Sequence, residues 1–183
     1  MEPIFIVLIA IAVIALFVIF LYNRLVKLKN QVKNAWSQID VQLKRRNDLI
    51  PNLVETVKGY AKHEKELLTN ITKERTAVMK SSSMEEKSKH SDQLSNTLKS
   101  LFAVSENYPK LKANENFLQL QEELSGTENK ISYSRQHYND MVLAFNTKIE
   151  QFPANMIAGM LNFKKKDFFK TPESERKNVK VSF

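Results

Sequence analysis

The side chains that most often carry catalysis or bind metals are few in this chain, and their spacing does not form a site. The 183 residues include three histidines and no cysteine. His63-Glu64 begins like the helix of a zinc protease, but Leu67 stands where that motif requires its second histidine. The sequence also has no phosphate-binding loop, no GxSxG turn and no Glu-x-x-His pair. We therefore expect no enzymatic activity, no cofactor and no metal site.

Basic residues are the next candidates, because the formal net charge is +8. The excess lies in two segments, +6 over residues 22–46 and +4 over residues 164–183, while the centre of the chain is balanced. Lys44–Arg46 would suit nucleic acid, but Asp40 and Asp48 lie on the same stretch and no aromatic residues alternate with the bases. We expect no nucleic-acid partner.

Residues 1–22 form the element that positions the rest of the chain. Ile4 to Leu21 is a run of eighteen apolar residues without a charge. As a helix it would extend about 27 Å, close to the ~30 Å hydrocarbon core of a bilayer. A cleaved signal peptide or a buried core helix would also be apolar. Glu2 in place of bases, and the bulky Phe20 at the end of the run, argue against cleavage and favour a transmembrane anchor.

The charges that flank this span predict its orientation and its lipid contacts. Glu2 precedes the span and several bases follow it, so the positive-inside rule places a short N-terminus outside and the soluble domain in the cytoplasm. Bases close to anionic lipid are each worth about 1 kcal/mol. The candidate lipid-contact residues are Tyr22, Arg24, Lys27, Lys164, Lys165 and Lys166. Alternatively, the first bases are topology signals alone, and the phenylalanines of the basic tail (164–183) pack into the core.

Residues 23–163 are predicted to form an all-α bundle. Only three glycines and five prolines interrupt the chain, and apolar residues recur at steps of three and four. Proline near Asn47–Pro51 predicts a kink, while Ser83 and Asn114 are expected to cap helices. We predict three long antiparallel helices, at 22–80, 84–107 and 115–152, and a short helix at 154–161.

The first of these helices carries an apolar seam with coiled-coil spacing over residues 22–50. A seam of this kind must be covered by a partner helix. We expect it to extend beyond what the second and third helices can cover, which predicts a homo-oligomer.

Several blocks of the sequence resemble the LemA family. They are Tyr22–Val26, Ala35–Arg46, Asp48–Val54, Val57–Ala61, Tyr138–Asn139, Phe152–Asn155, Ile157–Gly159, Glu175–Arg176 and Asn178–Phe183. The resemblance implies a bacterial inner-membrane protein with one N-terminal span and a cytoplasmic bundle of long antiparallel helices. It implies no established catalytic activity. Some relatives look like parts of membrane-associated assemblies, including a magnetosome protein, and gene neighbours suggest a membrane protease or a TPM-domain protein as a partner.

The polar residues of these blocks lie beside the apolar seam, which suggests buried pairing or a partner surface. The candidate interface residues are Trp36, Asp40, Arg45, Arg46, Asp48 and Pro51. Trp36 is either a core aromatic or an anchor between chains. The leading hypothesis is a membrane-anchored helical scaffold or adaptor that self-associates or recruits partners. The alternatives are a lipid-binding membrane-remodelling protein and a non-catalytic regulator of a membrane protease.

Overall fold

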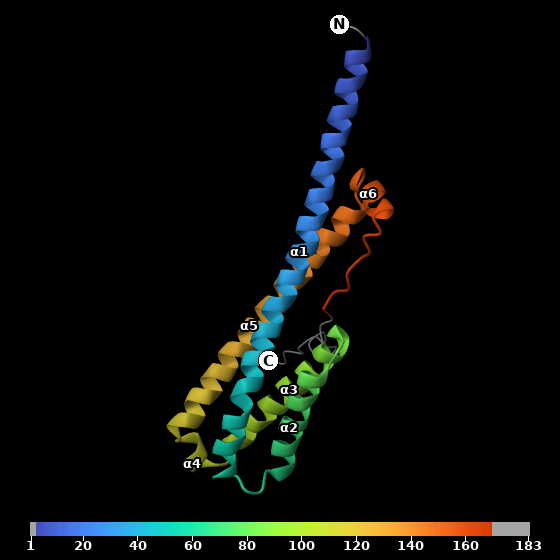
Figure 1. Cartoon of the computed structure of the whole chain (residues 1–183). Coiled ribbons are helices and arrows are strands. Elements are labelled where there is room, and N and C mark those ends of the chain that lie inside the picture. Colours follow the sequence, from blue (N-terminus) through green and yellow to red (C-terminus); the bar gives the residue numbers. More distant parts are fainter. Residues whose placement is uncertain (1–2, 170–183) are drawn as a thin grey trace, which may run out of the picture. The chain divides into compact units, whose positions relative to one another are not determined.

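In the computed structural model, which describes residues 3–169, every regular element is a helix (Figure 1). The helices are α1 (Pro3–Lys58), α2 (Lys65–Lys80), α3 (Met84–Ser105), α4 (Pro109–Lys112), α5 (Glu115–Glu150) and α6 (Ala154–Met160). The predicted all-α fold, an apolar N-terminal helix followed by a bundle of antiparallel helices, is confirmed. The described residues divide into a first unit (3–38 and 134–168) and a second unit (39–133 and 169).

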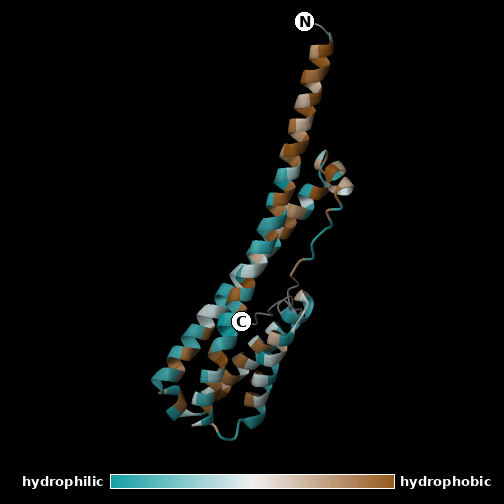
Figure 2. Ribbon diagram, in the orientation of Figure 1, coloured by the Kyte–Doolittle hydropathy of each residue, from teal (hydrophilic) through white to brown (hydrophobic). Residues whose placement is uncertain are grey.

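The N-terminal part of α1 has the properties of a membrane span. Among the described residues, α1 is the one helix long and apolar enough to cross a bilayer. Its first turns are uniformly hydrophobic (Figure 2), and the large side chains from Ile4 to Leu16 are each more than half exposed. Exposed apolar side chains in such a run are favourable in lipid and unfavourable in water. The predicted anchor therefore coincides with a stretch of α1 that the other described residues leave exposed.

Helix α1 continues through Pro51 and ends at Lys58, so the predicted single helix over 22–80 is wrong. The chain instead breaks at Gly59–Glu64 and resumes as α2. Proline at position 51 cannot donate the helical hydrogen bond to the carbonyl oxygen of Asn47. In the structure, Nε of Arg75 on α2 donates to that oxygen at 2.8 Å. The helix tolerates Pro51 because a side chain from the next helix replaces the missing backbone donor.

The predicted helix caps are confirmed. The hydroxyl of Ser83 accepts a hydrogen bond from the backbone N–H of Glu86 at the start of α3 (3.1 Å). The side-chain oxygen of Asn114 accepts from the N–H of Phe117 at the start of α5 (2.9 Å). Between α3 and α5, the residues that separate the predicted helices 84–107 and 115–152 contain the single turn α4, which begins with Pro109 at a position where proline is tolerated.

The second unit has an apolar core contributed by all of its helices. It is formed by Ile50, Leu53, Val54, Val57, Ala61, Leu68, Ile71, Val78, Leu94, Leu98, Leu101, Leu111, Phe117 and Leu124. The seam of α1 is buried along its length, from Leu25 (0% exposed) to Ile50 (1%). The expectation that this seam extends beyond its covering helices is therefore wrong, because the chain itself covers it.

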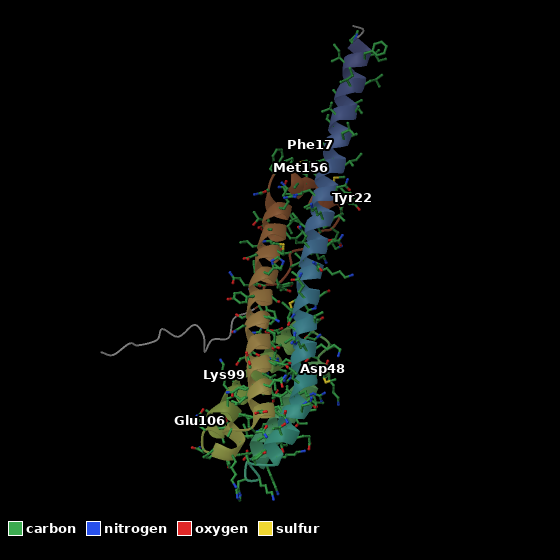
Figure 3. The ribbon with its side chains drawn as sticks, turned by 90° about the vertical axis from the view of Figure 1, so that its left-hand side faces the viewer. Phe17, Tyr22, Asp48, Lys99, Glu106 and Met156 are labelled. Carbon is green, nitrogen blue, oxygen red and sulfur yellow. The ribbon has the colours of Figure 1, made fainter. Side chains whose placement is uncertain are left out.

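In the first unit, α1 and the C-terminal half of α5 lie side by side, and α6 follows the end of α5 beside α1, which extends beyond it (Figures 1 and 3). Helix α6 confirms the predicted short helix at 154–161. Asn162, two residues after its last residue Met160, has a φ of 54°, in the left-handed region that asparagine tolerates. The N–H groups of Asn162 and Phe163 donate to Gly159 and Ala158 (3.2 and 2.9 Å), the pattern of a Schellman turn. This turn directs the following residues back along the unit.

Candidate functional site

The six candidate interface residues occupy three different environments. Arg46 is completely buried. Trp36 and Asp40 are half-buried, and Arg45, Asp48 and Pro51 are exposed. The sequence block that contains them thus contributes both an internal polar cluster and an outer surface.

The internal cluster surrounds the guanidinium of Arg46 and joins three helices of the second unit. Nη1 donates to the hydroxyl of Ser95 (2.8 Å) and to Glu128 Oε2 (2.9 Å), while Nη2 donates to the hydroxyl of Ser91 (2.9 Å). Ser95 also hydrogen-bonds Glu128. A buried charge is tolerated only when it is paired and hydrogen-bonded, and this geometry meets both conditions. The cluster fastens α1 to α3 and α5.

The serine hydroxyls of this cluster are placed for structure and not for nucleophilic attack. Ser91 is 0% exposed, so no substrate can reach it. Ser95 is half-buried, and its hydroxyl is engaged with Arg46, Glu128 and the carbonyl oxygen of Ser91. A triad would need a histidine oriented toward the hydroxyl. His90 instead hydrogen-bonds Glu74 through Nδ1 at 3.0 Å.

A second layer of ion pairs surrounds the cluster. Lys87 Nζ donates to Asp40 (2.9 Å), whereas Lys44 pairs with Asp48 (2.6 Å). Asp40 and Lys44 stand four residues apart in the order that favours a helical ion pair, but each pairs with a different residue. Because these pairs are partly or largely solvated, each is worth only a few tenths of a kcal/mol. Asp40 therefore serves as an additional α1–α3 contact.

The zinc-protease-like segment at His63-Glu64 does not lie on a helix, since α1 has ended and α2 begins at Lys65. The Glu64 carboxylate accepts a hydrogen bond from the hydroxyl of Tyr108 at 2.9 Å, and this bond raises the pKa of Tyr108. Among the described residues, no three histidine, aspartate or glutamate side chains are grouped to hold a metal ion. Glu64 thus links the α1–α2 connection to the start of α4.

Trp36 packs within the first unit, as the core interpretation predicted. Its ring meets that of Tyr138 edge to face, with centroids 5.7 Å apart. Tyr138 is 1% exposed, and its hydroxyl donates to the carbonyl oxygen of Asp167 at 3.0 Å. Burial raises the pKa of the Tyr138 phenol, with a smaller contribution from the charge of Asp167. Trp36 therefore packs against the tyrosine whose hydroxyl binds the backbone of the segment that follows α6.

The exposed members of the candidate interface share one face of α1. Val41, which is 62% exposed, lies at helical spacing from Arg45 and Asp48. Arg45 makes only a loose contact with Glu123 (3.9 Å). We call this surface the outer face of α1, and it comprises Val41, Lys44, Arg45, Asp48, Pro51 and Asn52. Asp48 is labelled in Figure 3, where its side chain projects away from the helix.

The candidate lipid-contact residues are all exposed in the first unit. Tyr22 is 43% exposed, and Arg24 and Lys27 also face solvent beyond the end of the apolar run. The segment with Lys164–Lys166 is fixed through its backbone, because Asn146 hydrogen-bonds both the N–H and the carbonyl oxygen of Lys166 (2.9 Å each). Residues 170–183 of the predicted basic tail lie outside the described residues.

The aromatic residues of this segment differ in their packing. Phe163 contacts Phe145, with ring centroids 6.3 Å apart, and lies beneath Nζ of Lys29 at 5.5 Å. Phe169 is buried, whereas Phe168 is 47% exposed. The core interpretation therefore holds for Phe163 and Phe169 and not for Phe168.

Sequence reasoning missed the partners of the buried cluster, namely Ser91, Ser95 and Glu128, as well as Lys87 and Arg75. One signal was present for Arg46, which lies three residues after Leu43 and four before Ile50. It therefore continues the buried stripe of α1. Its hydroxyl partners lie more than forty positions away and carry no local signal.

The chain is similar in sequence to a known protein family and to several named proteins. Residues 35–183 match the model of the LemA family. Protein LemA of Metamycoplasma hominis is 33% identical over 190 residues, which covers 99% of this chain and 84% of that protein. Magnetosome proteins MamQ 1 and MamQ 2 of Paramagnetospirillum magneticum are each 23% identical, covering 81% of this chain and 64% of their own length.

Proposed function

Because the chain belongs to the LemA family, we propose that it is a membrane-anchored helical adaptor that recruits a protein partner at the membrane surface. The anchor crosses the cytoplasmic membrane with its short N-terminus outside. The bundle lies in the cytoplasm and binds its partner through the outer face of α1. Two relatives are named for the magnetosome and not for a reaction, which supports a structural role.

The observation that carries this proposal is the division of α1 into a buried and an exposed face. Its apolar seam and Arg46 are buried within the chain. The exposed side combines an apolar residue, Val41, with flanking charges of both signs at Arg45 and Asp48. Protein interfaces commonly have an apolar centre and a polar rim, with arginine among the enriched residues. The outer face has this composition on a small scale.

Site-directed photocrosslinking in intact membranes tests the adaptor role. A photoreactive amino acid at Val41 is expected to give a discrete adduct with another protein chain. Tyr133 on α5 is the matched control, since it is 73% exposed and belongs to the same unit. An adduct whose mass equals two copies of this chain would identify the partner as the predicted homo-oligomer. Equal yields at positions 41 and 133, or no protein adduct at 41, would contradict the proposal.

The proposed topology has a separate test. The chain contains no cysteine, so single-cysteine variants report one position each. Lys99 is exposed on α3 (Figure 3), and a cysteine there should react with a membrane-impermeant maleimide only after the cells are opened. A cysteine in place of Glu2 should react in intact cells. The reverse pattern would place the bundle outside.

A further inference from the structure

Helix α6 shows the reverse of the burial pattern that is expected of a surface helix in water. It buries two small residues, Ala154 (0% exposed) and Ala158 (2%). Two of its three large apolar side chains are exposed, as are those just before and after the helix, while Ile157 is half-buried. Phe152 is 79% exposed, Met156 62%, Met160 85% and Leu161 50%. A short surface helix in water is expected to bury its large apolar residues and expose small or polar ones.

We propose that this surface, which we call the α6 tip (Phe152, Met156, Met160 and Leu161), inserts into the membrane interface beside the anchor. The proposal depends on α1 spanning the membrane but not on the adaptor role or on any protein partner. It gives the first unit two contacts with the same bilayer, one through the span and one through α6.

The position of α6 along α1 supports this occupant. Met156 lies beside the stretch of α1 between Phe17 and Tyr22 (Figure 3), and α6 adjoins the same part of α1 in Figure 1. The burial of α1 agrees, because every large apolar side chain from Ile4 to Phe20 is at least 42% exposed, whereas Leu21 is only 4% exposed. Leu21 is the last residue of the apolar run. If Ile4–Leu21 fills the hydrocarbon core, α6 lies at its boundary, the depth at which interfacial helices bury their apolar face.

The charge pattern around α6 supports the same occupant. Residues 151–163 contain no Asp, Glu, Lys or Arg, although 26% of the chain is charged. Three consecutive lysines follow, Lys164–Lys166, and all three are exposed. An uncharged apolar segment next to a basic cluster is typical of elements that lie in the surface of an anionic membrane. A water-facing segment of this length would have no reason to avoid charge.

The backbone around α6 presents the tip in a fixed orientation. The Schellman turn at Asn162 closes the helix, and the ring of Phe163 is held against Phe145. Asn146 fixes the backbone of Lys166. The exposed apolar side chains therefore belong to a segment tied into the unit on its C-terminal side, and they are available to lipid without unfolding.

Fluorescence quenching of the full chain in vesicles of phosphatidylcholine and phosphatidylglycerol tests the proposal. An environment-sensitive fluorophore is attached to single cysteines that replace Met156 or Met160. A cysteine at Phe17 reports the span, and one at Tyr133 reports an exposed apolar site on the second unit. We expect positions 156 and 160 to show blue-shifted emission and loss of intensity with nitroxide-labelled lipid, as at position 17. Position 133 should respond to aqueous iodide instead.

The controls separate the failure of this proposal from failure of the anchor. Far-UV circular dichroism should show the same helicity for all labelled variants, since the substituted positions are exposed. Iodide quenching at 156 and 160, with lipid quenching retained at 17, would overturn the α6 contact and leave the anchor intact. Protection of 156 and 160 from both quenchers would mean that a protein covers the tip, which also overturns it. Loss of lipid quenching at position 17 would overturn the anchor and the α6 contact together.

Discussion

The hydrogen bond from Arg75 to the backbone of Asn47 should be needed only because residue 51 is proline. Replacing Arg75 with methionine keeps much of the aliphatic stem but removes the Nε donor. The carbonyl oxygen of Asn47, a residue only 5% exposed, then loses its partner. Hydrogen bonds that involve a charged group contribute about 1.5–3 kcal/mol. Because Arg75 is half-buried, we expect R75M to lower the free energy of unfolding by about 1.5 kcal/mol.

The same substitution should cost much less when Pro51 is replaced by alanine. The backbone N–H of an alanine at this position can donate to the Asn47 carbonyl oxygen in the ordinary helical pattern, so Arg75 no longer supplies the missing donor. We expect the R75M loss to fall below about 0.5 kcal/mol in the P51A background, which corresponds to a coupling free energy of about 1 kcal/mol. The single P51A variant sets the reference, whatever its own effect on stability.

The four proteins of this cycle can be compared by chemical denaturation of the full chain in mild detergent, followed by far-UV circular dichroism. K73M is the matched control, because Lys73 is an exposed residue on the same helix, and it should change stability by less than about 0.5 kcal/mol. If R75M costs the same in both backgrounds, the side chain stabilises the fold by packing alone. That result would refute the explanation given for the uninterrupted helix.

Two further predictions concern the candidate site. In the same denaturation assay, R46M should lower the free energy of unfolding by about 3 kcal/mol, because it leaves Glu128 without its buried partner. R45M should lower it by less than about 0.5 kcal/mol, and equal losses would contradict the distinction between a buried and an exposed arginine. Burial and Asp167 raise the pKa of Tyr138 above its ordinary value of 10.0, so its stabilising contribution is complete below that pH and is lost as pH rises through the raised pKa. Denaturation midpoints should therefore fall more steeply above pH 10 for the wild type than for Y138F, and parallel curves would contradict this.

Most of the helical architecture could be predicted because its signals are local. Apolar residues at steps of three and four identified the buried stripes, from Leu25 to Ile50 on α1 and from Phe117 to Phe145 on α5. Ser83 and Asn114 were recognisable as caps from their own neighbours. The apolar run at Ile4–Leu21 needed no tertiary information at all.

The errors arose where residues distant in sequence decide the outcome. Pro51 carries the stronger local signal for an interruption, yet the helix ends only near Gly59, because Arg75 compensates for the proline. Phe152 is the last residue of the helix predicted at 115–152, but α5 ends at Glu150 and Phe152 is 79% exposed. Periodicity shows on which face of a helix the apolar residues lie, but it does not show whether another part of the chain covers that face.

Arg45 and Arg46 show the same limit for the candidate site. The two residues are adjacent and chemically identical, but Arg45 is exposed and Arg46 is 0% exposed. Helical phase distinguishes them, since only Arg46 continues the stripe of Leu43 and Ile50. Its hydroxyl partners on α3 and the neutralising Glu128 on α5 could not be identified from sequence, because serine and glutamate are also found on solvated helix faces.

The bond between Arg75 and Asn47 also has a consequence for the order in which the nascent chain can mature. If the apolar segment spans the membrane as proposed, it satisfies its own backbone groups and can become helical in lipid before the rest of the chain has folded. The turn around Asn47 cannot be completed in that way, because its last donor is made 28 positions later. The distal end of the longest helix is therefore finished only after a downstream helix has been synthesised and has docked against it.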